Sequence, residues 1–124
     1  MYALKKKMTP LEIEDRLIEF ASNIIELAEN LPQSPAGRHL GGQILRSGSS
    51  PALNYGEAQA AESKVDFVHK MKICLKELRE TFICLKLISK RNWFNPGRLE
   101  PLLKENNELI AIFVASTKTA VLKK

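Results

Sequence analysis

The feature that most constrains this chain is a heptad-like repeat of apolar residues between positions 10 and 31. Large apolar residues recur there at alternating steps of four and three, at Ile13, Leu17, Phe20, Ile24, Leu27 and Leu31. This spacing places them on one face of an α-helix. Thr9 can cap that helix, Pro10 suits its first position, and Glu12 can complete a capping box. We therefore predict a helix over residues 10–31.

Three further segments, 36–61, 64–91 and 96–121, have helical periodicity and are separated by short turns. Their predicted core positions are Leu40, Ile44, Ser47, Pro51, Tyr55 and Ala58, then Val68, Met71, Leu75, Leu78, Phe82 and Leu85, then Leu99, Leu102, Leu109, Ile110, Phe113, Val114, Ala120 and Val121. Pro51 lacks a backbone donor, so we expect the second helix to be kinked or broken there, with Ser50 as a possible new cap. Four amphipathic helices in 124 residues predict one all-α domain, an antiparallel up-and-down four-helix bundle.

The chain has more apolar helical surface than one bundle core can bury. Leu11, Ile18 and Ile25 are spaced by seven and form a second row on the first helix, and Ile73, Cys84 and Leu87 lie to one side of the third helix's predicted core row. Apolar surface left over in this way usually meets another subunit. We therefore expect a homo-oligomer.

Charge is sorted between the helices. The chain has 19 Lys and Arg against 14 Asp and Glu, a net charge of +5. Residues 10–31 hold six acidic residues and one basic one, whereas residues 63–91 hold eight basic and three acidic ones. At ~100° per residue, five cations of the third helix fall in one stripe, a basic ridge made of Lys72, Lys76, Arg79, Lys86 and Lys90.

Two interpretations of the basic ridge stay open. Its cations could each meet a phosphate of RNA, with Lys5, Lys6 and Lys7 as a supplement, which would give salt-dependent affinity with little sequence choice. The ridge could instead be a solvated face that pairs with acidic residues of the first helix.

A polar stripe borders the predicted core of the second helix. Arg46, Ser50, Asn54 and Glu57 share one side at steps of four, four and three. Arg46 could bond to Glu57, or to Glu77 and Glu80 of the third helix, and so fix the register between helices or subunits. A solvated face and a catalytic cleft are the alternatives.

Other residue patterns argue against an enzyme or a metalloprotein. Cys74 and Cys84 are ten residues apart on one helix, about 15 Å, too far for a disulfide, and are expected to be buried thiols. His39 and His69 have no nucleophile or metal-ligand spacing around them. The longest apolar run, residues 109–115, is too short to cross a bilayer. We expect a cytoplasmic protein without catalytic residues, cofactor or metal.

Several segments resemble the four helix bundle proteins, a family that includes proteins encoded by intervening sequences of bacterial 23S rRNA genes. The segments are QILRS at 43–47 with Ser50, NYGEA at 54–58, and LKELRET at 75–81. The resemblance implies an up-and-down bundle, often assembled as a five-membered ring, without catalysis. It also implies that the recurrent polar positions are Arg46, Asn54, Glu57, Glu77 and Glu80. A similar bundle is the accessory protein of diversity-generating retroelements.

The leading hypothesis is a non-enzymatic homo-oligomer, with a pentamer favoured, that associates with RNA through the basic ridge. The alternative is a protein-interaction scaffold or accessory subunit for a partner enzyme, without direct contact to nucleic acid.

Overall fold

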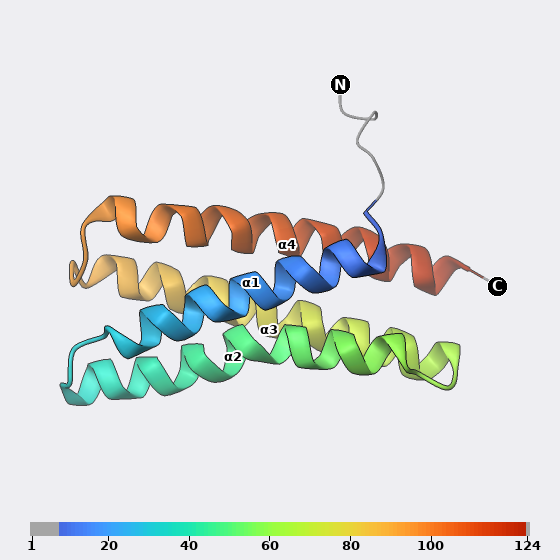
Figure 1. Ribbon diagram of the computed structural model, residues 1–124, viewed down its shortest axis with the longest axis horizontal. Coiled ribbons are helices and arrows are strands. Elements are labelled where there is room, and N and C mark those ends of the chain that lie inside the picture. The colour runs from blue at the N-terminus through green and yellow to red at the C-terminus, as the bar shows by residue number, and fades with distance from the viewer. Residues whose placement is uncertain (1–7, 124) are drawn as a thin grey trace, which may run out of the picture.

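The computed structural model describes residues 8–123, and its architecture is an up-and-down bundle of four helices (Figure 1). The helices are α1 (Pro10–Glu29), α2 (Pro35–Gln59), α3 (Lys64–Lys90) and α4 (Pro96–Leu122). Residues 8–123 contain no strand. The predicted fold class is therefore confirmed, and each helix begins and ends within two residues of the range predicted for it.

The order of the helices around the bundle decides which faces can meet. α2 packs extensively on both α1 and α3, and α3 packs on α4, whereas α1 and α4 touch only briefly. The backbones of α1 and α3 are not adjacent, nor are those of α2 and α4, which meet only through side chains in the core. Each of these two pairs therefore occupies opposite corners of the bundle.

Local capping explains where the helices begin. Thr9 and Glu12 form the predicted capping box, with the Thr9 hydroxyl accepting from the Glu12 amide at 3.1 Å. The Ser34 and Ser63 hydroxyls accept from the amides of Gly37 and Asp66. These bonds satisfy backbone donors that a helix start leaves unpaired.

The core of the first two helices matches the prediction closely. All six predicted positions of α1 are buried, and in α2 only Leu40 is half-buried while the other five are buried. Tyr55 meets the Phe113 ring of α4 edge-on, with the centroids 5.6 Å apart. Between residues 8 and 123, no helix has the length and hydropathy needed to cross a membrane.

The predicted core rows of α3 and α4 need correction. Val68, Leu75 and Phe82 are only half-buried, while Cys74, Thr81, Cys84 and Ile88 belong to the core. The reason is that α3 packs on α2 as well as on α4, so its buried face is centred nearer α2. In α4, Asn106 and Thr117 are buried, whereas Val114 and Val121 are exposed.

α2 is one helix from Pro35 to Gln59 with Pro51 inside it, so the restart at Ser50 is wrong. Side chains supply donors to the carbonyl groups that precede Pro51. Ser49 Oγ donates to the Leu45 carbonyl at 2.7 Å, and Asn54 Nδ2 donates to the Ser50 carbonyl at 3.0 Å. These bonds reinforce the helix on either side of Pro51, which cannot itself donate to the Ser47 carbonyl four residues earlier.

Gly48 allows α2 to approach α1 closely. A Cβ at this position would lie 2.6 Å from Ile24 Cγ2 and 3.0 Å from Ile24 Cβ. Ile24 is completely buried and cannot turn away. The glycine is therefore a packing requirement of this helix pair.

Replacing Gly48 by alanine should destabilise the protein by about 1–3 kcal/mol, because the new methyl group overpacks the core. Gly56→Ala is the matched control, since an added Cβ there meets nothing within 4 Å. That control should stabilise α2 by about 0.5–1 kcal/mol through helix propensity. Urea unfolding of both variants measures the difference, and equal effects would contradict the packing argument.

Candidate functional site

The basic ridge lies on the outer face of α3, and all five of its cations are exposed. Its members are Lys72, Lys76, Arg79, Lys86 and Lys90. Three of them, Lys72, Arg79 and Lys86, are spaced by seven and form one row. Lys86 Nζ lies 5.2 Å from the centre of the Phe82 ring, which holds its stem against the helix. Lys5, Lys6 and Lys7 lie outside the described residues.

The ridge is not neutralised by the protein's own acids. The ion pairs between residues 8 and 123 join Arg16, Arg46 and Lys70 to glutamates, and no ridge residue takes part in one. α1 carries six acidic residues, but it lies at the opposite corner from α3. Outward faces of opposite helices are more than ~20 Å apart, beyond the ~8 Å Debye length. Pairing of the ridge with α1 is therefore not what the structure shows.

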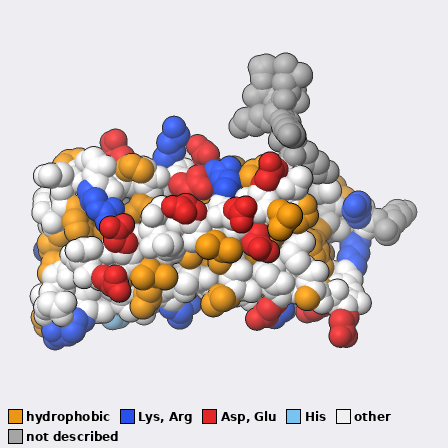
Figure 2. Space-filling model, in the orientation of Figure 1, with side chains coloured by type: hydrophobic (Ala, Val, Ile, Leu, Met, Phe, Trp, Pro, Cys, Tyr) orange, Lys and Arg blue, Asp and Glu red, His pale blue; other side chains and the backbone are white. Residues whose placement is uncertain are grey.

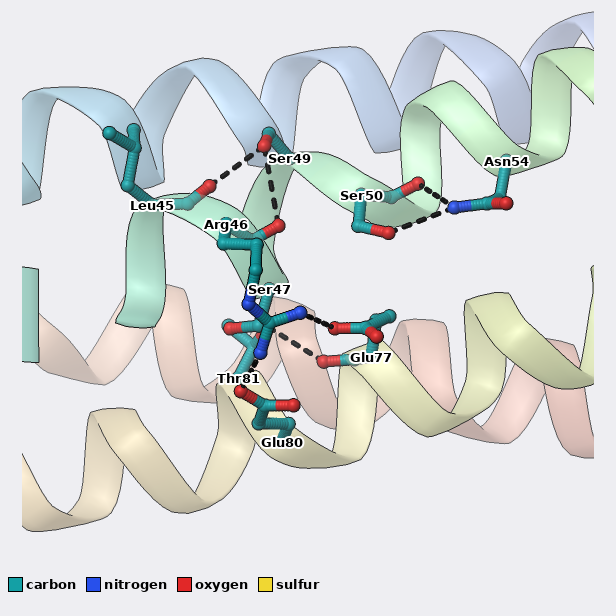
Figure 3. A network of polar contacts seen from close by, with 9 residues as sticks. All are labelled: Leu45, Arg46, Ser47, Ser49, Ser50, Asn54, Glu77, Glu80 and Thr81. Atoms are coloured by element: carbon teal, nitrogen blue, oxygen red, sulfur yellow. Dashed lines mark hydrogen bonds and ion pairs between the residues drawn. The ribbon is translucent and has the colours of Figure 1, made fainter. Parts of the chain in front are cut away.

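A partly buried ion-pair cluster, which we call the Arg46 cluster, links α2 to α3 (Figure 3). Arg46 Nη1 donates to Glu77 Oε1 at 2.8 Å, and Arg46 Nη2 donates to Glu80 Oε2. The side chain of Glu77 is only 11% exposed, whereas that of Arg46 is 53% exposed. The hydrogen bonds that Arg46 donates to Glu80 and then to Glu77 raise the pKa of Arg46, so its guanidinium stays charged.

The structure does not bring the other two predicted polar positions into this cluster. Asn54 Nδ2 donates to Ser50 Oγ at 2.8 Å within α2. Glu57 accepts from Lys70 Nζ at 2.6 Å, and this bond raises the pKa of Lys70. Asn54 therefore supports its own helix, and Glu57 makes a separate, exposed link to α3.

Three polar links were not predicted. Thr81 Oγ1 donates to Ser47 Oγ at 2.9 Å, directly beneath the Arg46 cluster (Figure 3). Asn106 Nδ2 donates to the Leu78 carbonyl at 3.0 Å, which joins α4 to α3. Arg16 holds Glu105 and Glu108 of α4. Spacing could have revealed that Thr81 and Asn106 are buried, since each lies in a row of apolar residues that recur at steps of three and four. No local sequence pattern indicates the partners of Arg16.

The described residues offer little for catalysis. No group of three or more His, Cys, Asp or Glu side chains in residues 8–123 could hold a metal ion. His39 and His69 are exposed. Burial raises the pKa of Cys74 to about 12, and it also raises that of Cys84, so both are neutral thiols rather than nucleophiles at pH 7. The arrangement of Arg46, Glu77 and Glu80 therefore cross-links helices.

Glu77→Gln should lower the free energy of unfolding by about 1–2 kcal/mol, because a largely buried partner of Arg46 loses its charge. Glu57→Gln is the matched control: it breaks the exposed pair with Lys70 and should cost less than about 0.5 kcal/mol. Thermal unfolding of both variants tests the ranking. A cost at Glu57 equal to that at Glu77 would count against the Arg46 cluster as the register-fixing contact.

Cys74 should make stability fall as the pH rises above 9. An unfolded thiol ionises near its ordinary pKa of 9.0, whereas the folded one keeps its proton up to about 12. The unfolded state therefore binds fewer protons in this window, and stability declines by up to about 1.4 kcal/mol per pH unit. Urea unfolding at pH 8 and pH 10 measures this, and Cys74→Ala should show a smaller decline.

Comparison with known proteins assigns the fold to a family. The family model for the 23S rRNA-intervening sequence protein matches residues 9–115. A crystal structure of a protein of unknown function from the S23 ribosomal protein family of Bacteroides thetaiotaomicron is similar at a TM-score of 0.82 and 31% identity. The match covers 90% of this chain and 99% of that one. No curated protein matches. This chain belongs to the 23S rRNA-intervening sequence protein family.

Proposed function

We propose that this protein is a non-enzymatic, self-associating bundle that binds RNA through the basic ridge of α3. The observation that carries the proposal is that the five ridge cations are exposed and unpaired among the described residues. They are exposed, make no ion pair within residues 8–123, and lie across the bundle from the acidic helix. An unpaired row of cations on a rigid helix is suited to a polyanion.

The ridge is suited to phosphates rather than to base edges. Lysine and arginine on a straight helix can each neutralise one backbone phosphate, which positions the protein without reading sequence. The exposed part of the ridge offers no aromatic platform for stacking, since Phe82 is half-buried beneath Lys86. The proposed binding is therefore salt-dependent and weakly selective.

Self-association is the second part of the proposal, with the five-membered ring as the favoured assembly. It is supported by exposed apolar residues on the outer side of α1, namely Leu11, Ile18 and Ile25. A ring would repeat the ridge once per copy, so that weak phosphate contacts add up along one RNA.

Neutralising the heptad row with Lys72→Gln, Arg79→Gln and Lys86→Gln together should weaken binding to a generic single-stranded RNA by about 10- to 100-fold at low salt. It should also make the slope of log K against log salt shallower by about 2, because each lost phosphate contact removes ~0.7. Fluorescence anisotropy at several salt concentrations measures both. Lys104→Gln with Lys123→Gln is the matched control, as both side chains are exposed on or beside α4.

Equal binding by the ridge variant and the control would overturn the ridge as the RNA site, as would wild-type binding without a salt slope. In that case a scaffold for a partner protein becomes the better interpretation. Affinity capture after nuclease treatment then identifies it, since a protein partner survives the loss of nucleic acid.

A further inference from the structure

The protein has two exposed apolar surfaces of opposite charge. The first, which we call the acidic face, is the outer side of α1 and α2: Leu11, Ile18 and Ile25 are 70%, 52% and 39% exposed, and Leu45 is 43% exposed. In Figure 2 hydrophobic side chains alternate with acidic ones over α1. The second, which we call the basic edge, holds Ile83 and Leu87 of α3, 60% and 47% exposed, among the ridge cations.

The acidic face contains a hollow that an apolar side chain could enter. The hollow has a volume of about 270 Å³ and lies between the end of α1 and the start of α2. Ile25, Gly41 and Leu45 form part of its apolar lining, and Glu29 and Arg38 both lie at the same site. A small depression with an apolar lining suits an aliphatic side chain.

We propose that the basic edge of one copy packs into the acidic face of a second copy, with Ile83 and Leu87 against the hollow. The inference rests on the self-association proposed above and names its two surfaces. Charge complementarity supports it, because α1 carries six acidic residues against one basic residue, and Lys90 lies one turn beyond Leu87 on the same side of α3. Two acidic faces, or two basic edges, would repel each other.

The two surfaces also lie at the same level along the bundle. A Cβ at Gly41 would meet Leu31 at 3.4 Å, which places the hollow beside the end of α1. Cys84 Sγ lies 3.9 Å from the Leu40 carbonyl, so Ile83 and Leu87 of α3 are level with that same part of α2. Rotation about an axis parallel to the helices does not shift one copy along the bundle relative to the next. The basic edge of one copy therefore lies at the same height as the hollow of its neighbour.

The positions of the surfaces allow a closed ring. Both lean toward α2: Ile25 shares the hollow with Leu45 of α2, and Ile83 and Leu87 follow Glu80, which binds Arg46 of α2, on the same side of α3. Surfaces on either side of one helix are not directly opposed, so a head-to-tail contact between them turns at every step, and it closes into a ring when the turns add up to a full circle. The row of Lys72, Arg79 and Lys86 lies on the side of α3 nearer Phe82, whereas Leu87 and Glu80 lie on the side nearer α2.

A mixing experiment tests the head-to-tail contact. The double variant Ile18→Lys, Ile25→Lys removes two apolar residues of the acidic face and reverses part of its charge. The double variant Ile83→Glu, Leu87→Glu does the same to the basic edge. Each double variant should be monomeric, near the chain mass of 14.0 kDa, in sedimentation velocity at micromolar concentration. Mixed together, the two should form a complex of at least one copy of each, because each retains the surface that the other lacks.

Val114→Glu with Val121→Glu is the matched control, since these α4 residues are 41% and 49% exposed and lie on neither surface. This variant should assemble as the wild type does, and circular dichroism should show all three variants to be helical. The absence of a mixed complex, or dissociation by the α4 variant alone, would overturn the contact. A monomeric wild type would overturn self-association as a whole, whereas RNA binding is judged separately by the Lys72, Arg79 and Lys86 variant.

Discussion

Opposite placement of the acidic and basic helices is the constraint on which the surface chemistry of this protein depends. α1 and α3 occupy opposite corners of the bundle, and their backbones are not adjacent. Their charges therefore cannot cancel within one chain, because the outward faces are separated by more than a Debye length. Each charged face remains available to something outside the protomer, and each also exposes apolar side chains. The core of the protomer is well packed, and its surface leaves both charged and apolar side chains exposed.

α2 is the helix that holds this arrangement together, and it does so with small and polar residues rather than with a wide apolar face. Gly48 brings it against Ile24 of α1, while Ser47 and Arg46 bind Thr81, Glu77 and Glu80 of α3. An apolar interface tolerates sliding, whereas a bidentate arginine between two carboxylates has one favourable register. The Arg46 cluster therefore favours one axial register of α3 relative to α2.

Much of the fold could be predicted from the sequence, because the bundle is built from local signals. The row on α1 was fully predicted, since one face of that helix does all the packing. The core of α3 was placed too far from α2, because spacing alone cannot weigh Cys84 and Thr81 against Phe82 when a helix packs on two neighbours. The isolation of the ridge from α1 could also have been deduced, since short turns place consecutive helices side by side and so put the first and third helices of a four-helix bundle at opposite corners. The link from Arg16 to Glu105 and Glu108 could not, because it depends on the brief contact between α1 and α4.

A ring built on the acidic face and the basic edge would also determine where nucleic acid can run. Both surfaces border α2, so that helix would turn toward the ring axis. α2 contributes two arginines and one glutamate, and Arg46 is already held by Glu77 and Glu80. A channel lined by such a helix has little positive potential to attract phosphates. RNA would instead follow Lys72, Arg79 and Lys86 from copy to copy around the assembly, because these cations make no ion pair within residues 8–123.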